Sequence, residues 1–206
     1  MSRVGIFGAS GSGKSTYVKG AIGKRARVVV FDPLQEYAAK TTAHTVDQVR
    51  SQMRADWTGF RIAFVPKAGQ EPRALSQLCK FLITAQGRFI AGYSDKRLTL
   101  VVEEMNLAFP VHGGDDKCPG FAEVCSRGRH FGIDVFGVSQ RIAEVGTRFR
   151  GNLSEIVILR QQGARDLNTA VQESGAAVQD VRALKNYQYL TVQGGDVRKG
   201  TVRRSR

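Results

Sequence analysis

Hydrophobic residues occur along this chain in short runs, separated by polar, glycine-rich and amphipathic segments. Short apolar runs that end at turn-forming or polar residues are typical of buried strands. On this pattern we expect strands at residues 4–7, 27–31, 60–65, 97–104, 133–139, 155–159, 187–193 and 197–203. The last two flank a Gly-Gly-Asp turn, which predicts a C-terminal β-hairpin.

Helices are expected between these strands. In the longest segment Leu75, Leu78, Leu82, Ala85 and Phe89 recur at spacings of three and four, which predicts a helix with one apolar face. We interpret that face as core. Further helices are expected at residues 16–22, 46–54, 121–129, 142–149, 165–173 and 176–184, and loops at 67–73 and 105–120. The alternation of strands and helices predicts an α/β fold with a mainly parallel central sheet flanked by helices.

Residues 8–16 read Gly-Ala-Ser-Gly-Ser-Gly-Lys-Ser-Thr and match G-x-x-x-x-G-K-[ST], the P-loop, between a predicted strand and a predicted helix. Its glycines let successive backbone N–H groups face one anion, and the helix N-terminus adds partial positive charge. Lys14 can reach the β- and γ-phosphates, and the Ser15 hydroxyl can ligate Mg²⁺. We therefore expect ATP and Mg²⁺ to bind at Gly8, Ser10, Gly11, Ser12, Gly13, Lys14, Ser15 and Thr16.

The predicted strand at 97–104 ends in two carboxylates, Glu103 and Glu104. In P-loop ATPases the strand beside the P-loop strand ends in an acid that holds Mg²⁺, and a second acid polarises the attacking water. Since neighbouring strand residues point to opposite faces, we expect Glu103 to serve the metal with Ser15 and Glu104 to activate the water. Gln140, at the tip of strand 133–139, can bond the γ-phosphate or the water. The alternatives are a solvated strand end and a loop glutamine.

The chain has 31 Lys and Arg against 18 Asp and Glu, a net charge of +13. This excess indicates a polyanionic partner, with nucleic acid first, although a basic but otherwise ordinary protein is the alternative. A length of 206 residues predicts a single domain, 1–206. No apolar run approaches the roughly 18 residues needed to cross a membrane, so we expect a protein that does not itself span one.

Several ordered segments resemble the FtsK–HerA superfamily of ring-forming, DNA-pumping ATPases. The first two are the P-loop and the Phe31-Asp32-Pro33 segment with Glu36-Tyr37. The others are Val101-Val102-Glu103-Glu104 with Asn106-Leu107-Ala108, Arg127-Gly128-Arg129-His130-Phe131-Gly132-Ile133, Val138-Ser139-Gln140-Arg141, Ile156-Val157-Ile158-Leu159-Arg160 and Leu184-Lys185-Asn186-Tyr187. A bare motor domain of this size is similar to the genome-packaging ATPases of tailless icosahedral viruses with an internal membrane and double jelly-roll capsids.

This resemblance implies a RecA-like ATPase fold and a homo-oligomeric ring, a hexamer, that moves double-stranded DNA into a preformed procapsid. It implies docking to a procapsid vertex or membrane-associated portal proteins, and a location in the host cytoplasm or at the virion vertex. It assigns water activation to Glu104 and a sensor role to Gln140. Arg127 or Arg129 matches an arginine finger for a neighbouring subunit, an effect worth 10³–10⁵ in rate in other NTPases. Weaker finger candidates are Arg148, Arg150 and Arg160.

The sequence departs from the family pattern at one position. The metal-side acid is usually Asp, where this chain has Glu103, so the roles of Glu103 and Glu104 could be swapped or shared. Loops 67–73 and 111–117 are candidate DNA contacts. A zinc site at His112, Cys118, Cys125 and His130 is a weak alternative, because their spacing fits no common pattern.

Three other functions remain open. The first is a small P-loop kinase for a nucleotide or metabolite, against which stand the tandem acids, Gln140 and the basic charge. The second is a nucleotide-gated DNA-binding or assembly ATPase. The third is a filamentous-phage assembly ATPase, although such proteins usually carry a membrane segment.

Overall fold

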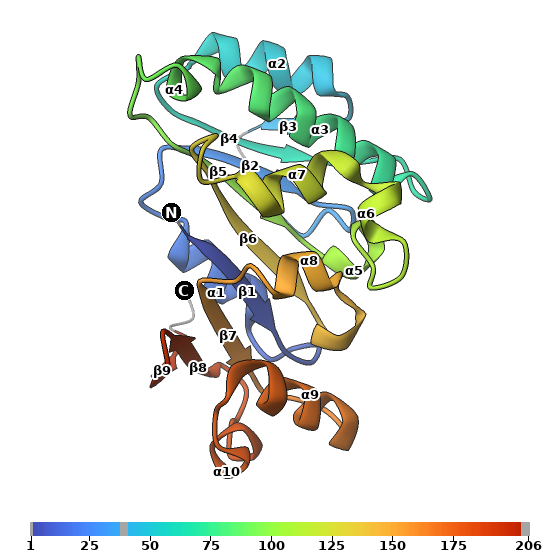
Figure 1. The fold of residues 1–206 in the computed structure, drawn as a ribbon, viewed down its shortest axis with the longest axis vertical. Coiled ribbons are helices and arrows are strands. Elements are labelled where there is room, and N and C mark those ends of the chain that lie inside the picture. The colour runs from blue at the N-terminus through green and yellow to red at the C-terminus, as the bar shows by residue number, and fades with distance from the viewer. Residues whose placement is uncertain (1, 38–40, 203–206) are drawn as a thin grey trace.

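The computed structural model describes residues 2–37 and 41–202, and within them nine strands form one sheet (Figure 1). The strands follow the order β3-β4-β2-β5-β6-β1-β7-β8-β9. Their bounds are β1 (Arg3–Phe7), β2 (Arg27–Phe31), β3 (Thr41–Ala43), β4 (Phe60–Phe64), β5 (Leu98–Val102), β6 (Ile133–Ser139), β7 (Glu155–Leu159), β8 (Gln188–Gln193) and β9 (Asp196–Thr201).

The sheet is parallel from β3 to β7, and β8 and β9 add to it in antiparallel directions. Every residue of β2, β5 and β6 is buried. Such burial on both faces explains why these strands appear in the sequence as continuous apolar runs. The predicted α/β class, with its mainly parallel sheet and C-terminal hairpin, is confirmed. The end of the last predicted strand, residue 203, lies outside the described residues.

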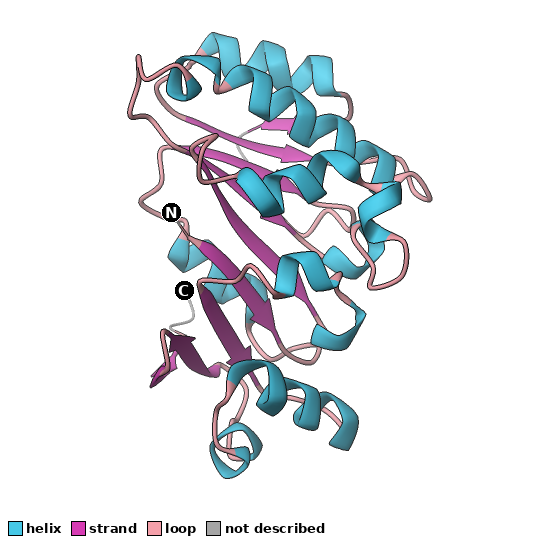
Figure 2. Cartoon of the chain, in the orientation of Figure 1, coloured by secondary structure: helices cyan, strands magenta, loops and turns pink. Residues whose placement is uncertain are grey.

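Helices cover the two faces of the sheet unequally (Figures 1 and 2). The larger hydrophobic cluster packs α2, α3, α5, α7 and α8 on one face, and α1 packs on the other through Val18 and Ile22. A third cluster packs α9 and α10 against β7 and β8. The helices are α1 (Lys14–Ala21), α2 (Val46–Ala55), α3 (Glu71–Ala85), α4 (Gly87–Ile90), α5 (Met105–Ala108), α6 (Gly114–Lys117), α7 (Pro119–Arg127), the 3₁₀ turn η1 (Ile142–Glu144), α8 (Thr147–Arg150), α9 (Ala164–Ser174) and α10 (Val178–Arg182).

Several segments differ from the sequence prediction. The expected strand 97–104 ends at Val102, so Glu103 and Glu104 follow β5 instead of lying within it, and the expected helix that reaches Phe89 is divided into α3 and α4. The expected loop at 105–120 contains the short helices α5 and α6, and α7 begins at Pro119. The expected single helix at 142–149 is two short turns, η1 and α8, because Val145 pairs in an extended bridge with Pro110 and Gly146 donates its N–H to the Phe109 carbonyl. The short edge strand β3 was not predicted.

Candidate active site

The P-loop connects the end of β1 to the start of α1, with Gly13 at the N-cap position of that helix. Gly13 has a φ of 106°, and a Cβ there would lie 2.9 Å from the Tyr187 ring, so this position requires glycine on two counts. Lys14 donates from Nζ to the carbonyl oxygens of Gly8 (2.9 Å) and Ala9 (3.3 Å). The P-loop lysine thus closes onto its own loop.

Two further observations test whether this loop fits a phosphate group. The Ser12 hydroxyl is buried and has no hydrogen-bond partner among the described residues. Buried polar atoms are nearly always hydrogen-bonded, so this hydroxyl can accept a further partner. Burial lowers the pKa of Lys14, whereas the carboxylates of Glu104, Glu103 and Glu36 act to raise it. A buried lysine and an unsatisfied hydroxyl on a glycine-rich loop before a helix suit an anion.

A pocket of about 220 Å³ brings most of the predicted site residues together. Its lining joins the P-loop to the residues that follow β5 and β6, since parallel strands end at the same edge of the sheet. The lining residues are Ser10, Gly11, Gly13, Lys14, Ser15, Thr16, Glu36, Glu103, Glu104, Gln140 and Tyr187. A larger pocket of about 620 Å³ lies beside α2 and α3 and contains none of the predicted site residues.

The two adjacent carboxylates take different environments. Glu103 is 4% exposed and accepts a hydrogen bond of 2.6 Å from the Tyr37 hydroxyl. Burial raises the pKa of Glu103 to about 7, against the lowering effect of that hydrogen bond. Glu104 is half-buried, and its backbone lies in the left-handed region (φ 41°). Its carboxylate accepts a hydrogen bond of 3.3 Å from Gln140 Nε2. A non-glycine residue at positive φ is costly, and such strain is common at functional sites.

The strand order corrects one expectation. The acid-bearing strand β5 does not lie beside the P-loop strand β1, because β6 lies between them. Strand order depends on crossover connections, which local sequence patterns do not encode. The insertion places Gln140, which follows β6, between the P-loop and the carboxylates, and this explains the contact of Gln140 with Glu104.

Glu36 and Tyr37 received no role from the sequence, yet both lie at the site. The buried Asp32 carboxylate follows β2 and accepts the backbone N–H groups of Glu36 and Tyr37, at 2.9 Å each. This turn directs Glu36 to Ser15, whose hydroxyl donates to Glu36 Oε2 at 3.2 Å, and Tyr37 to Glu103. The sequence offered two signals, the Asp32-Pro33 turn at the end of a predicted strand and the place of Glu36-Tyr37 among the segments that resemble the superfamily. Neither signal identifies what these side chains contact.

Tyr187 is a second residue that the sequence did not assign. Its backbone N–H donates to the Ser12 carbonyl at 2.8 Å, and its carbonyl accepts from Val202 N–H at 2.7 Å. Its φ of 66° and its position against Gly13 place the ring at the pocket. The C-terminal segment therefore supports the P-loop directly.

The structure separates the two leading finger candidates, Arg127 and Arg129, from the pocket, whereas Arg160 contacts the P-loop. Arg127 and Arg129 are exposed and precede β6, whereas the pocket lies beyond its other end. A seven-residue strand spans about 20 Å at roughly 3.3 Å per residue, so neither arginine reaches the pocket of its own chain. Arg148 pairs with Asp115 and Arg150 with Glu173. Arg160 donates to the Ser10 carbonyl of the P-loop at 3.2 Å.

The donor set of the pocket suits a hard cation such as Mg²⁺, because it offers the Ser15 hydroxyl and carboxylates. No group of three His, Cys, Asp or Glu side chains could hold a metal within residues 2–37 and 41–202. Mg²⁺ is usually held by one or two protein groups together with phosphates, so it needs no such cage. The zinc alternative lacks support, since Cys118 and Cys125 are buried while His112 and His130 are exposed.

Comparison with known proteins gives one family match. Residues 1–102 match a family model described as the central domain of the helicase HerA. Among curated proteins, none matches this sequence. The match and the fold confirm the resemblance to the FtsK–HerA superfamily.

Solved structures resemble nearly the whole chain. The genome-packaging NTPase B204 of Sulfolobus turreted icosahedral virus 2, in complex with AMPPCP, aligns with a TM-score of 0.78 and 16% identity over 99% of this chain and 98% of its own. VirB4 of Thermoanaerobacter pseudethanolicus aligns with a TM-score of 0.70 and 12% identity over 98% and 89%. At these identities the likeness shows the fold alone, which this chain shares with P-loop ATPases. In the part of the chain that the structure describes, no helix has the length and apolar character to cross a bilayer.

Proposed function

We propose that this chain, whose fold is that of HerA-type P-loop ATPases, is an ATP-driven translocase of double-stranded DNA that packages a viral genome into a preformed procapsid. The observation that carries the proposal is the pocket in which Lys14 and Ser15 meet Glu103, Glu104 and Gln140. Further support comes from a packaging NTPase of the same fold, whose structure holds the ATP analogue AMPPCP.

In this proposal the P-loop binds the phosphates of ATP. Lys14 exchanges the Gly8 and Ala9 carbonyls for phosphate oxygens, and the Ser12 hydroxyl gains the partner that it lacks among the described residues. Ser15 and Glu103 would hold Mg²⁺, which neutralises charge on the phosphates when it is bound. Tyr37 fixes Glu103 through its hydroxyl, and Glu36 lies close enough to Ser15 to share the metal side of the site.

Glu104 is the group proposed to activate water. Its carboxylate is partly exposed in the pocket, where it can orient a water molecule and accept its proton. Gln140 already donates to Glu104 Oε1, so a change at the γ-phosphate would alter this hydrogen bond. That arrangement gives Gln140 the sensor role.

The assembly proposed is a hexameric ring of single motor domains, each spanning residues 1–206. The ring would act on double-stranded DNA while docked to a procapsid vertex or to membrane-associated portal proteins. It would be located in the host cytoplasm or at the virion vertex. Since Arg127 and Arg129 lie far from the pocket of their own chain, either could serve as a finger only for a neighbouring subunit. A cation supplied in this way would stabilise transition-state charge.

The proposal is tested by measuring ATP hydrolysis with and without long double-stranded DNA across a salt series. Stimulation that fades with rising salt is expected for a motor that contacts phosphates. Lys14→Ala is expected to lose turnover, and Glu104→Gln to bind ATP without hydrolysing it. Undiminished hydrolysis by Glu104→Gln would exclude its role as the base. Activity indifferent to DNA, with phosphate transfer to a small acceptor, would favour the kinase alternative.

The finger is tested with mixed rings. Inactive Glu104→Gln subunits are combined with inactive Arg127→Ala or Arg129→Ala subunits, and partial recovery of hydrolysis is expected for the arginine that acts across the interface. Absence of recovery for both arginines would count against action in trans.

A further inference from the structure

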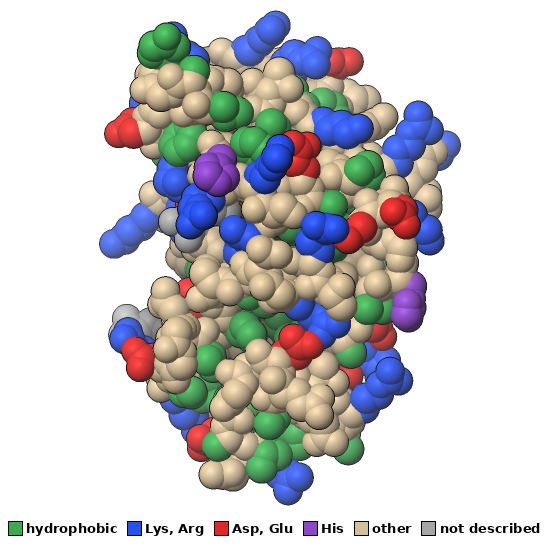
Figure 3. Space-filling view, viewed as in Figure 1, with side chains coloured by type: hydrophobic (Ala, Val, Ile, Leu, Met, Phe, Trp, Pro, Cys, Tyr) green, Lys and Arg blue, Asp and Glu red, His purple; other side chains and the backbone are tan. Residues whose placement is uncertain are grey.

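The edge of the sheet opposite the nucleotide pocket is strongly basic. Parallel strands begin at this amino edge, and the loops that lead into β2, β5 and β6 (residues 22–26, 91–97 and 128–132) contain five basic residues and one acidic residue. We define the amino-edge basic surface as Lys24, Arg25, Lys96 and Arg97. In Figure 3, Lys and Arg side chains are spread over the face, and some of them lie near the left edge, where Figure 1 places the N-terminus.

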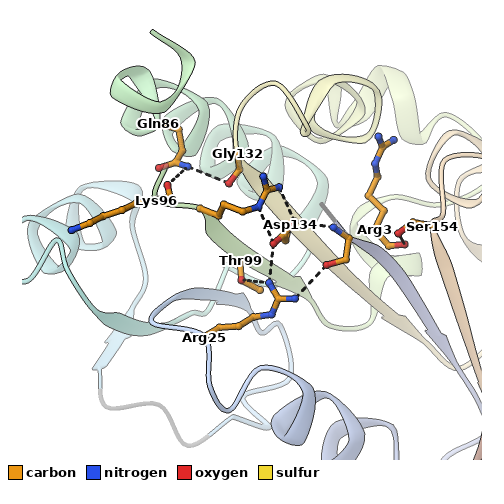
Figure 4. Close-up of polar contacts among 10 residues, drawn as sticks. Arg3, Arg25, Gln86, Lys96, Thr99, Gly132, Asp134 and Ser154 are labelled. Atoms are coloured by element: carbon orange, nitrogen blue, oxygen red, sulfur yellow. Dashed lines mark hydrogen bonds and ion pairs between the residues drawn. The ribbon is translucent and has the colours of Figure 1, made fainter. Parts of the chain in front are cut away.

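Two of these arginines are held by one buried carboxylate (Figure 4). Asp134, with a side chain 6% exposed, accepts from Arg25 Nη1 and from Arg97 Nη2, at 2.8 Å each. Arg25 also donates to Thr99 Oγ1 at 3.2 Å, and the Ser2 N–H donates to Asp134 at 2.9 Å. Although burial acts to raise the pKa of Asp134, the hydrogen bonds from Arg97, Ser2 and Arg25 lower it below the ordinary value, so the carboxylate stays charged.

This arrangement leaves positive charge and donors on the surface. One carboxylate neutralises one of two guanidinium groups, while the side chains of Arg25 and Arg97 remain 31% and 35% exposed. The Nη1 group of Arg97 makes none of the contacts to Asp134. Because both side chains are already ordered, an anion that binds them bears little of the usual entropic cost. Planar guanidinium groups with free N–H donors suit phosphate oxygens.

Neighbouring residues extend the same chemistry. Lys96 is exposed and points away from the network in Figure 4. Tyr93, in the same loop, is 77% exposed, so its hydroxyl can donate to an anion. The field of Arg129 reaches Arg3, whose pKa is lowered first by burial and also by that cation. The amino edge therefore repels further cations and attracts polyanions.

The opposite edge is less suited to a polyanion. The nucleotide pocket is lined by Glu36, Glu103 and Glu104 against the single cation Lys14. The two loops first considered for DNA contact also carry little net charge. Residues 67–73 hold two basic groups and one acid, and residues 111–117 hold one lysine and two acids.

We propose that the amino-edge basic surface binds the phosphate backbone of duplex DNA. This inference rests on the proposed function, since it names where the translocated polymer is held. Contacts of this kind position DNA without reading its sequence, so binding should be insensitive to sequence and sensitive to salt. The occupant is a phosphodiester backbone, whose regular charge matches a row of loops along one sheet edge.

The test uses the full chain and a short fluorescent duplex, with binding measured by anisotropy across a salt series. Lys24→Glu combined with Lys96→Glu changes two exposed side chains and spares the Asp134 network. The matched control is Lys67→Glu combined with Arg73→Glu, which makes the same charge change in one of the other candidate loops. The amino-edge pair is expected to weaken binding on the order of tenfold or more and to lower the slope of log K against log salt by about 1.8, roughly 0.9 per lost contact. The control pair is expected to bind as the wild type does.

Thermal unfolding of each variant checks that it is folded, and light scattering measures its self-association. ATP hydrolysis by the wild type is measured separately. Equal DNA affinity in the amino-edge pair and the wild type, or a larger loss in the control pair, would overturn the inference and leave the translocase proposal standing. Loss of self-association without loss of DNA affinity would assign the surface to an interface between copies instead. Wild-type protein that binds DNA through this surface but does not hydrolyse ATP would contradict the proposed function alone.

Discussion

Replacing Glu103 by Gln should change how the stability of the nucleotide-free protein depends on pH. Glu103 is 4% exposed, and burial is the main cause that raises its pKa from 4.5 to about 7. The nearby carboxylates of Glu36, Glu104 and Asp32 act in the same direction, while the Tyr37 hydrogen bond opposes them. Gln is close in shape to Glu and can still accept from Tyr37, but it does not titrate.

The sign follows from proton linkage. A carboxyl whose pKa is higher in the folded state holds its proton more tightly when folded, so its contribution to stability is full below pH 4.5 and is lost as pH rises through 7. With those two values, the free energy of unfolding of the wild type should fall by about 2.5 kcal/mol more than that of Glu103→Gln between pH 5 and pH 8. At pH 8 the variant should therefore be the more stable protein, although it is expected to lose activity, a trade-off found at many functional sites.

Urea unfolding at pH 5, 6, 7 and 8 measures this difference, with a chelator present and no nucleotide. Titrating groups that do not interact with Glu103 are common to both proteins and cancel in the comparison. Glu104→Gln is the matched control, because it removes the adjacent, half-buried carboxylate. Parallel stability curves for the wild type and Glu103→Gln would refute the reasoning, and an equal effect in the control would assign it to general charge repulsion in the pocket.

Two further predictions concern single contacts. Tyr37→Phe removes the hydrogen bond that lowers the pKa of Glu103, so the loss of stability with rising pH should be larger than in the wild type in the same titration; an unchanged slope would contradict this role. Gly120→Ala would place a methyl group against the backbone carbonyl of Ser76, so it should destabilise the fold by about 1–3 kcal/mol in urea unfolding, and wild-type stability would show that the two segments can separate at no cost.

The sequence predicted three interior strands with accurate bounds, whereas the expected strand 97–104 is longer than β5 (Leu98–Val102). Residues 27–31, 133–139 and 155–159 are strands as expected, since a continuous apolar run between polar ends leaves little freedom in placing such an element. The prediction of a single helix at 142–149 was wrong because Val145 pairs with the distant residue Pro110, which a helical pattern in the local sequence does not reveal. The edge strand β3 is three residues long and two of them are exposed, so it leaves no apolar signal.

The candidate site was predicted only in part, because local sequence patterns reveal some of its residues and not others. The P-loop and the residues after β5 and β6 are local features of sequence, and the structure brings them into one pocket. Glu36 and Tyr37 depend on a turn that Asp32 organises and on partners 21 and 66 positions away along the chain. No local pattern encodes such distances. The position of β6 between β5 and β1 likewise follows from packing of the whole sheet.

Strand direction separates the two proposed binding chemistries. Arg25 and Arg97 precede β2 and β5, whereas Glu103 and Gln140 follow β5 and β6. The length of β6, about 20 Å at roughly 3.3 Å per residue, exceeds the Debye length of about 8 Å at physiological salt. Direct electrostatic coupling between nucleotide and DNA within one chain would therefore be weak. If both proposals hold, ATP hydrolysis must influence DNA through movement of the strands or of whole subunits, and β6, with Asp134 near its start and Gln140 after its end, connects the two edges.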